Sequence, residues 1–220
     1  QDIENKQSQL LALQTQINPH FLYNTLECIN SAGAICGSRE VEEMTTALAY
    51  LFRYACKGSH IVRLQDELNS LQYYLSIQEI RFPEHFSVSY DIPANLMNCS
   101  VLKFLLQPIV ENSIQHGFHE CEGHRRICIS AALEAQDLLI SIVDNGTGMS
   151  EIELMQLQER LDSPNEDLDR AGLNNIQRRI RLYYSEVYGL QIKSRAGEGT
   201  SVIARLPAVE FDYEREKIHV

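Results

Sequence analysis

The stretch of sequence that decides the fold is residues 138–149, LLISIVDNGTGM, where an apolar run leads directly into a glycine-rich turn. A short apolar run bounded by turn residues is typical of a buried β-strand. Asp144 then lies at the end of that strand. Gly146 and Gly148 permit positive φ and the close approach of another group to the backbone. Hairpin turns use the same residue types, so this motif alone favours a plain turn over a ligand site.

Strands and helices are both predicted around this stretch. Two helices are expected, from about Val101 to His116 and from Leu173 to Tyr184, because apolar residues recur there at helical spacing. Helices combined with a mostly antiparallel sheet define the α+β class. Four further strands are predicted from short alternating or apolar runs, at residues 86–90, 127–129, 190–192 and 202–204.

Before Pro83 the pattern is helical throughout. A first helix carries apolar residues at spacings of three or four and is expected to end near Gly37. A second helix is predicted from about Ser38, a suitable N-cap, to about Cys56. Long helices joined by short connections pack antiparallel, so these two form a helical hairpin. A third helix begins near Gln65 and stops before Pro83, because the residue preceding a proline avoids the helical region.

The change of pattern at residue 83 predicts two domains and a tail. The chain has 220 residues, a length that suits two small domains better than one large one. We expect a helical domain over residues 1–83 and an α+β domain over residues 84–210. Residues 211–220 are rich in charge and are expected to form a frayed tail.

Charge and composition exclude several classes of protein. The net charge is -11, which disfavours a nucleic-acid surface because phosphate contacts need clustered Lys and Arg. The sequence has neither a long apolar run that could span a membrane nor a signal-peptide pattern at its start. The chain opens on Gln1 within a helical pattern, so we expect it to be part of a longer protein. The cysteines lack C-x-x-C spacing, which favours reduced thiols over a zinc site.

The segment of residues 16–24, QINPHFLYN, places a proline inside a helical pattern. Pro19 lacks an N–H and crowds the carbonyl of Thr15, at a cost of about 3 kcal/mol in a helix interior. The expected kink opens the backbone beside His20. Neutral imidazole is a nucleophile whose charge changes near neutral pH, so His20 is a candidate acceptor for the γ-phosphate of ATP. On this segment alone, an ordinary histidine on a bent helix is the favoured interpretation.

Residues 107–117, QPIVENSIQHG, form a second cluster of polar side chains on a predicted helix. Asn112 and His116 are four residues apart and are expected to share one helix face. The amide oxygen of Asn112 suits Mg²⁺, which prefers hard oxygen ligands, and His116 would then face the phosphates. Gly117 is expected to end the helix in a left-handed conformation. An ordinary helix with a polar outer side explains the same pattern equally well.

Two further glycine motifs follow along the chain. Gly172 and Leu173 open the predicted helix, and a glycine there lets backbone N–H groups meet a phosphate. Gly197, Gly199 and Thr200 lie between the last two predicted strands. Taken alone, this second motif is typical of a plain hairpin.

The motifs together resemble those of known families. The QINPHFLYN segment, with the segments around Tyr50–Tyr54 and Leu64–Phe82, is similar to the LytS/YesM-like sensor histidine kinases over about residues 8–207. The order E-N-x-x-x-H-G, D-N-G-x-G, G-L-x-N and G-x-G-T resembles the Bergerat ATP-binding fold of gyrase B, the chaperone Hsp90, histidine kinases and MutL. This resemblance implies an α/β sandwich with ATP between its helices and a mixed sheet, and residues 150–171 as a mobile lid.

The resemblance also implies roles for individual residues. Adenine would bind Asp144, Mg²⁺ would bind Asn112, and His20 would accept the phosphate. Glu111 is the candidate general base, because Phe21 stands where many histidine kinases carry an acidic residue; a purely structural Glu111 is an equal alternative. Arg170 stands where the lid of the family carries a glycine, so the catalytic rate is uncertain. The residues expected to bind the nucleotide are Asn112, His116, Asp144, Gly146, Gly148, Gly172, Leu173, Gly197, Gly199 and Thr200.

The function expected from this resemblance is that of a bacterial two-component sensor histidine kinase. Two chains would pair their helical hairpins into a four-helix bundle, ATP would phosphorylate His20, and the phosphate would pass to the receiver domain of a response regulator. The chain would be the cytoplasmic part of a protein anchored in the membrane by upstream segments. Three alternatives stay open: an inactive nucleotide-binding scaffold, another ATPase of the same fold, and a kinase of the anti-sigma type that phosphorylates a partner.

Overall fold

Two compact units make up the chain. The computed structural model describes residues 19–56, 58–82, 86–118, 124–162 and 172–212, with side chains from residue 22 onward. One unit consists of Gln1–Lys57 and Tyr73–Arg81, and the other of Gly58–Gln72 and Phe82–Val220. We call them the helical unit and the sheet unit. The domain boundary predicted at residue 83 stays a prediction.

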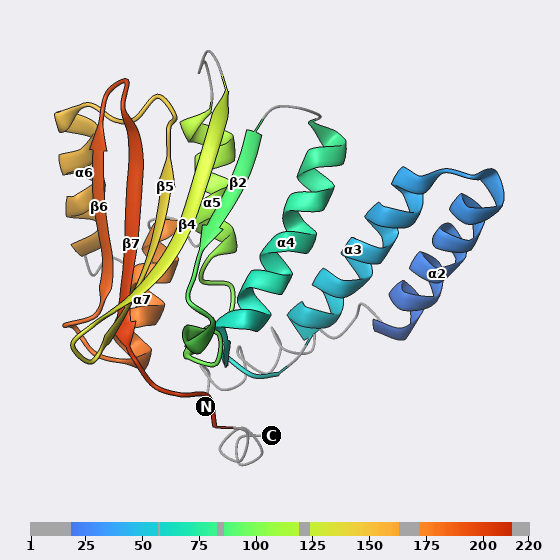
Figure 1. The fold of residues 1–220 in the computed structure, drawn as a ribbon, viewed down its shortest axis with the longest axis horizontal. Coiled ribbons are helices and arrows are strands. Elements are labelled where there is room, and N and C mark those ends of the chain that lie inside the picture. The colour runs from blue at the N-terminus through green and yellow to red at the C-terminus, as the bar shows by residue number, and fades with distance from the viewer. Residues whose placement is uncertain (1–18, 57, 83–85, 119–123, 163–171, 213–220) are drawn as a thin grey trace, which may run out of the picture. The chain divides into compact units, whose positions relative to one another are not determined.

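The helical unit is built on a hairpin of α2 (Pro19–Cys36) and α3 (Arg39–Cys56), as predicted (Figure 1). Gly37 ends α2 with a φ of +67°, and the N–H of Ser38 donates to the carbonyl of Gly33 at 2.9 Å. Gly33 also lets the helices approach closely, because a Cβ at this position would lie 2.7 Å from Cγ1 of Val41. The last part of α4 (Leu64–Arg81) completes the unit, with Tyr73 stacked on Tyr50 of α3 at 4.1 Å between ring centroids.

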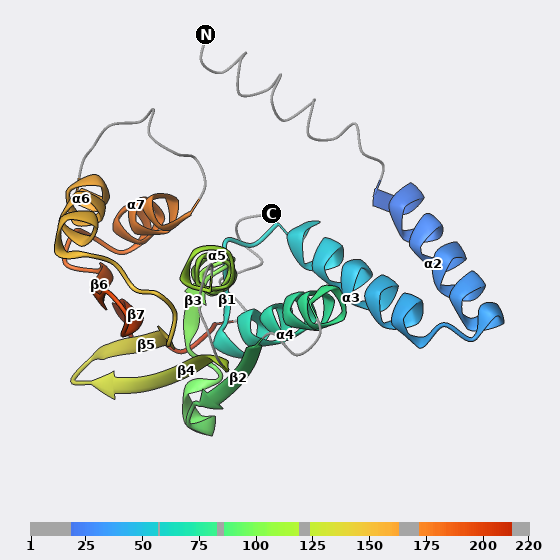
Figure 2. The ribbon, with the colours of Figure 1, turned by 90° about the horizontal axis from the view of Figure 1, so that it is seen from above.

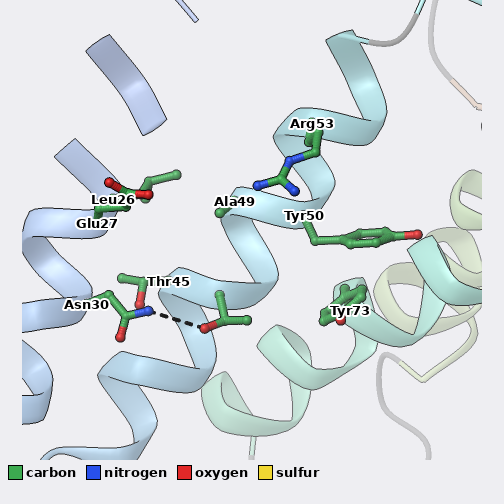
Figure 3. A pocket seen from close by; sticks show the side chains of 9 residues that line it. Leu26, Glu27, Asn30, Thr45, Ala49, Tyr50, Arg53 and Tyr73 are labelled. Atoms are coloured by element: carbon green, nitrogen blue, oxygen red, sulfur yellow. Dashed lines mark hydrogen bonds between the residues drawn. The ribbon is translucent and has the colours of Figure 1, made fainter. Parts of the chain in front are cut away.

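The interior of the helical unit is incompletely filled. A pocket of about 300 Å³ lies between its helices (Figure 3). Asn30 donates to the hydroxyl of Thr46 across it, at 3.4 Å. The side chains that line it are largely polar: Leu26, Glu27, Asn30, Thr45, Thr46, Ala49, Tyr50, Arg53 and Tyr73. Several large apolar side chains of the same hairpin are exposed, namely Ile29, Ile35, Met44 and Leu48.

A five-stranded mixed sheet forms the centre of the sheet unit. The strand order is β2-β4-β5-β7-β6, with β2 parallel to β4 and every other pair antiparallel. The mostly antiparallel sheet of the α+β prediction is confirmed. The strands are β2 (Phe86–Asp91), β4 (Arg125–Glu134), β5 (Asp137–Asp144), β6 (Gly189–Arg195) and β7 (Gly199–Pro207).

Helices α5 (Gln107–Asn112), α6 (Glu151–Asp162) and α7 (Leu173–Tyr183) cover one face of this sheet (Figure 2). The core between the two layers is apolar, and the side chains of Ile127, Ile140, Ile109 and Ile180 are almost fully buried. Alternate residues of a strand point to opposite faces, which is why the buried positions of β5 recur at every second residue. None of the helices in the described ranges combines the length and apolar character of a membrane span.

The structure corrects the helix predicted from Val101 to His116. Residues 100–102 instead form strand β3 (Ser100–Leu102), which pairs antiparallel with β1 (Ile61–Arg63), and a turn leads from β3 to α5. A short 3-10 helix, η1 (Ala94–Leu96), precedes β3. The start of α4 is joined to the same region, because the N–H groups of Leu64 and Gln65 donate to carbonyls of Cys99 and Met97.

The stretch predicted as a mobile lid, residues 150–171, includes a helix that was not predicted, and its role as a lid stays a prediction. Its first half is α6, whose start carries a reciprocal capping pair: the N–H of Ser150 donates to Glu153 at 2.8 Å, and the N–H of Glu153 donates to the hydroxyl of Ser150 at 3.4 Å. The hydrogen bond from the Ser150 hydroxyl, followed by the one from its N–H, lowers the pKa of Glu153. Residues 163–171, with Arg170, lie outside the described residues, as does the predicted tail beyond residue 212.

Candidate functional site

Asp144 is a buried carboxylate at the end of β5. Its Oδ1 accepts hydrogen bonds from the N–H groups of Gly146 at 2.9 Å and Thr200 at 3.2 Å. Its Oδ2 accepts from the hydroxyl of Ser113 at 2.8 Å. Burying a charge is costly unless it is hydrogen-bonded, and these donors from three different elements hold the carboxylate in one orientation. Of the predicted site residues, Asp144, Gly146 and Thr200 are therefore brought together.

The Ser113 hydroxyl reaches Asp144 from the point where the helix changes its winding. α5 ends at Asn112 and continues as the π-helix η2 (Ser113–Gly117), in which the N–H of Phe118 donates to the carbonyl of Ser113 at 3.1 Å. Gly117 does not take the left-handed conformation that we expected. Its lack of a side chain has another cause: a Cβ at Gly117 would lie 3.2 Å from Oδ1 of Asp144.

Three glycines predicted to bind nucleotide stand where the backbone of another segment leaves no room for a side chain. A Cβ at Gly146 would lie 2.1 Å from the carbonyl oxygen of Gly117, and a Cβ at Gly199 would lie 2.0 Å from that of Asp144. Gly148 has a φ of +64°, and its Cβ would lie 2.0 Å from the carbonyl oxygen of Arg195. These glycines pack the loop after β5 between η2 and the start of β7.

Backbone hydrogen bonds hold the same loop to the turn between β6 and β7. The N–H of Thr147 donates to the carbonyl of Gly117 at 2.8 Å, and the N–H of Gly197 donates to the carbonyl of Thr147 at 2.7 Å. The N–H of Met149 donates to the hydroxyl of Ser194 at 2.9 Å. Gly197 thus joins the cluster through its backbone, so the residues of the D-N-G-x-G and G-x-G-T motifs form one connected structure.

Asn145 secures the other side of the loop, against the first residues of β4. Its Oδ1 accepts from the N–H of Arg126 at 2.6 Å, and its Nδ2 donates to the carbonyl of His124 at 2.9 Å. Sequence reasoning quoted Asn145 only as part of a motif. Its side chain ties the loop to the sheet, which leaves the backbone of Gly146 and Gly148 in a defined position.

Asn112, His116 and Glu111 lie on the same short segment as Ser113. Asn112 is the last residue of α5 and is half-buried, and His116 on η2 is exposed. The carboxylate of Glu111 accepts a hydrogen bond from the side chain of Gln115 at 2.9 Å. The α-to-π transition falls between Asn112 and His116, so the helical spacing assumed from the sequence does not describe their mutual position.

Gly172 and Leu173 stand at the start of α7, as predicted. Gly172 precedes the helix with a φ of +87°, a conformation that favours glycine, and no side chain caps this end. Within α7, Oδ1 of Asn174 is buried without a hydrogen-bond partner. The contacts found among the described residues do not join Gly172 or Leu173 to the Asp144 cluster, so their role stays a prediction.

His20 belongs to α2, whose described part begins at Pro19. The predicted kink involves residues before Pro19, which lie outside the described residues, and the His20 side chain is not described either. Its assignment as the acceptor therefore stays a prediction.

Ser113 is the site residue that sequence reasoning missed. It lies inside the quoted E-N-x-x-x-H-G motif, but no spacing rule connects it with a carboxylate 31 positions later. Burial raises the pKa of two groups elsewhere in the described part of the sheet unit. Burial, and secondarily the charge of Glu210, raises the pKa of the Cys99 thiol. Burial, with a smaller contribution from Tyr183, raises the pKa of Tyr184 to about 12.

The residues present are compatible with Mg²⁺ bound through a nucleotide. No group of three or more His, Cys, Asp or Glu side chains suited to a metal occurs among the described residues. Mg²⁺ in nucleotide sites is held by phosphates, water and only one or two protein oxygens, so it does not require such a group. The half-buried amide of Asn112, one residue from the Asp144 cluster, supplies an oxygen of the right kind.

Two family models match the chain. Residues 8–86 match the model described as histidine kinase, and residues 99–210 match the model described as histidine kinase-, DNA gyrase B-, and HSP90-like ATPase. The chain therefore belongs to this ATPase family. The match of residues 8–86 and the relatives described next agree with the resemblance to sensor histidine kinases found in the sequence. Membership of the ATPase family implies nucleotide binding by residues 99–210.

The relatives are bacterial sensor kinases. The chain is 35% identical over 203 residues to sensor histidine kinase YesM of Bacillus subtilis (strain 168), covering 92% of the chain and 34% of that protein. It is 30% identical over 200 residues to sensor protein kinase HptS of Staphylococcus aureus (strain USA300), covering 90% of the chain and 38% of that protein. The chain thus spans about a third of the length of the curated relatives it matches.

A solved structure is also similar. The histidine kinase domain of the blue-light activated histidine kinase from Erythrobacter litoralis EL346 gives a TM-score of 0.49 at 17% sequence identity, covering 87% of this chain and 86% of that one.

Proposed function

We propose that this chain is the catalytic region of a bacterial sensor histidine kinase, which transfers the γ-phosphate of ATP to His20 and then to a receiver-domain aspartate of a response regulator. The observation that carries the proposal is the buried Asp144 carboxylate, held by Ser113, Gly146 and Thr200 beside glycines that no side chain could replace. Similarity to YesM and HptS, both named as sensor kinases, supports the same function.

The nucleotide would bind across the Asp144 cluster. The carboxylate of Asp144 accepts a hydrogen bond from the amine of adenine, and the loop of Gly146 and Gly148 lets the base approach the backbone. Asn112 would hold Mg²⁺, which would neutralise charge on the phosphates. His116 is exposed on the same segment and faces the phosphates, and the start of α7 at Gly172 and Leu173 offers free backbone N–H groups to them.

Phosphoryl transfer then depends mainly on positioning. A ring nitrogen of His20 forms a bond to the γ-phosphorus while the bond from that phosphorus to the β-γ bridging oxygen breaks, which releases ADP. The proton of the attacking imidazole passes to a base, for which Glu111 is the candidate. Its carboxylate is half-buried and oriented by Gln115.

A second copy of the chain would complete the helical unit. The hairpin of α2 and α3 leaves Ile29, Ile35, Met44 and Leu48 exposed, and large apolar side chains grouped on one hairpin favour burial against a partner. We infer that two hairpins form a four-helix bundle. Segments upstream of residue 1 would attach this cytoplasmic region to the membrane and carry the signal.

The proposal is tested by incubating the chain with γ-labelled ATP and Mg²⁺ and measuring phosphate that is labile in acid. We expect the wild type to become labelled and His20→Ala to remain unlabelled. His60→Ala is the matched control, since it removes a different histidine, whose side chain is exposed, and it should be labelled like the wild type. Acid-labile phosphate on His20→Ala would refute the assignment of the acceptor. ATP binding by the wild type without any labelling would favour the inactive scaffold, and label found only on a partner would favour the anti-sigma type.

The nucleotide site is tested separately with Asp144→Asn, which keeps the shape of the side chain and removes its charge. We expect ATP affinity to fall about 100-fold or more. The backbone N–H groups of Gly146 and Thr200 lose their charged acceptor, and the adenine amine loses a charged acceptor as well. Asp91→Asn makes the same charge change at an exposed position of the same sheet and should bind ATP normally. Unchanged affinity in Asp144→Asn would exclude this carboxylate as the base-binding group.

A further inference from the structure

Glu67 is a buried carboxylate in the first turn of α4 that the proposed mechanism does not use. It is 2% exposed and accepts hydrogen bonds from three consecutive backbone N–H groups. Its Oε1 accepts from Phe104 at 2.6 Å. Its Oε2 accepts from Leu105 at 2.9 Å and Leu106 at 3.1 Å. Hydrogen bonds to an ionised acceptor are stronger than neutral ones, so this carboxylate holds residues 104–106 firmly.

The three N–H groups belong to the turn that starts α5. The first N–H groups of a helix have no partner within it, and Leu106, which precedes the first residue of α5, provides no side-chain cap. Phe104 has a φ of +56°, which a bulky residue keeps only where its surroundings fix it. Glu67 therefore pairs the N–H groups of the turn that leads into α5, the last of them that of the N-cap residue Leu106, and constrains the turn from a position 37 residues earlier in the chain.

A second contact holds this turn from α7. Nη2 of Arg179 donates to the carbonyl of Lys103 at 2.6 Å. Lys103 is itself buried, with Nζ 5.6 Å from the centroid of the Phe104 ring. The turn of residues 103–106 is thus fixed by α4 and by α7, and α7 is the helix that begins directly after Gly172.

The turn controls the position of the nucleotide-site residues that follow it. α5 is 6 residues long, so a shift at its first residue carries through to Asn112 at its end. Ser113, the next residue, donates to Asp144 at 2.8 Å. We propose that Glu67 is a positioning residue for the nucleotide site: through the turn and α5, it sets where Asn112 and Ser113 lie. This inference rests on the proposed binding of nucleotide at Asp144 and Asn112.

The test is calorimetric titration of the 220-residue chain with the β,γ-imido analogue of ATP in the presence of Mg²⁺. Glu67→Gln keeps the size of the side chain but offers an amide nitrogen where a backbone N–H needs an acceptor. We expect its Kd to rise about fivefold or more, with one analogue still bound per chain. Glu79→Gln makes the same charge change at an exposed position of the same helix, and its Kd should stay within about twofold of the wild type.

Kd and stoichiometry, which the same titration measures, together distinguish a positioning role from a role in folding. If the carboxylate of Glu67 serves folding alone, Glu67→Gln should lower the fraction of chains that bind and leave the Kd of those chains unchanged. This result would overturn the inference. If Glu67→Gln does not fold, Glu67→Asp keeps the charge on a shorter side chain and should also raise Kd. Failure of both variants to fold would count against the inference in the same way. Absence of binding by the wild type would instead refute the proposed function.

Discussion

In the sheet unit the side chains between the sheet and its helices are withdrawn from solvent, whereas the described part of the α2–α3 hairpin buries few large apolar side chains. Ile127, Ile129 and Ile140 are each 0% exposed, while Ile35 on α2 is 86% exposed and Leu48 on α3 is 48% exposed. The sheet unit has enough elements to close a core from a single chain. The described part of the helical unit consists of a hairpin and part of one more helix, and it contains an open pocket.

The difference indicates that the two units depend on different partners. A hairpin in water cannot bury both faces of its helices, so a second hairpin is the simplest cover for the exposed apolar side chains of α2 and α3. The sheet unit, in contrast, places its buried polar groups around one carboxylate and leaves its apolar core complete. Mutations in the core of the sheet unit should therefore change its stability at every protein concentration. Mutations on the surface of the helical unit should mainly change the association of two chains.

The largest expected effect is that of Ile140→Ala in β5. The substitution removes a fully buried side chain and leaves a cavity, at a cost of about 2–5 kcal/mol in the free energy of unfolding. Urea unfolding followed by circular dichroism measures it, and the loss should not vary with protein concentration. Leu133→Ala in the same sheet is the control, because Leu133 is 50% exposed and should cost less than about 0.5 kcal/mol. Equal losses in the two variants would contradict a closed core.

A smaller effect is expected from pH, through Tyr184. Its pKa is raised to about 12, mainly because burial disfavours the phenolate, so the unfolded chain releases this proton near pH 10 and the folded chain does not. The stabilisation is complete below pH 10 and is lost as pH rises towards 12. Between pH 9 and 11 the wild type should lose about 1 kcal/mol more than Tyr184→Phe. The Tyr184 hydroxyl is buried without a hydrogen-bond partner, so Tyr184→Phe should be no less stable at pH 7. A parallel pH dependence of the two proteins in urea unfolding would refute this.

The smallest change in unfolding free energy is expected for Leu48→Ala in α3. Leu48 is half exposed within one chain, so its removal should cost less than about 1 kcal/mol in dilute protein. If a second chain covers it, the dissociation constant of the dimer should rise about tenfold, as measured by sedimentation across a dilution series. Ile152→Ala removes an apolar side chain that is 65% exposed on α6 and should leave the dimer unchanged. Equal dissociation constants for all three proteins would argue against a hairpin interface.

Most of the sheet could be predicted because its strands carry a local signal. The apolar run of β5 and the alternation in β2 reveal strands without any knowledge of their neighbours. The parallel pairing of β2 with β4 and the order of the strands depend on contacts between distant segments, which no local pattern records.

The errors have physical causes that differ. Residues 101–106, VLKFLL, are apolar except for Lys103, and periodicity cannot distinguish a short buried strand from a helix in such a run. What ends the strand and starts α5 is the carboxylate of Glu67, far away in sequence. Helix α6 was not predicted although its signal was present, because Ser150 and Glu153 form a capping box ahead of apolar residues at helical spacing.

The candidate site was predictable as a set of motifs but not as a structure. Asp144, Gly146 and Thr200 were each identified from a weak motif, and the structure joins them by hydrogen bonds. The role of Ser113 follows from the π-helical turn, and that of Gly117 from its distance to Asp144, neither of which is encoded in residue spacing.

The hydrogen bonds at Asp144 have a consequence for the choice of nucleobase. A carboxylate can accept about four hydrogen bonds. Among the described residues, both places on Oδ1 are taken by N–H groups, and one place on Oδ2 is taken by Ser113. The remaining lone pair on Oδ2 can accept a hydrogen bond from a donor and repels another acceptor. Adenine presents an amine at position 6, whereas guanine presents a carbonyl oxygen there. The single remaining lone pair of Asp144 would therefore favour adenine over guanine, and GTP would compete poorly with ATP even when both are abundant.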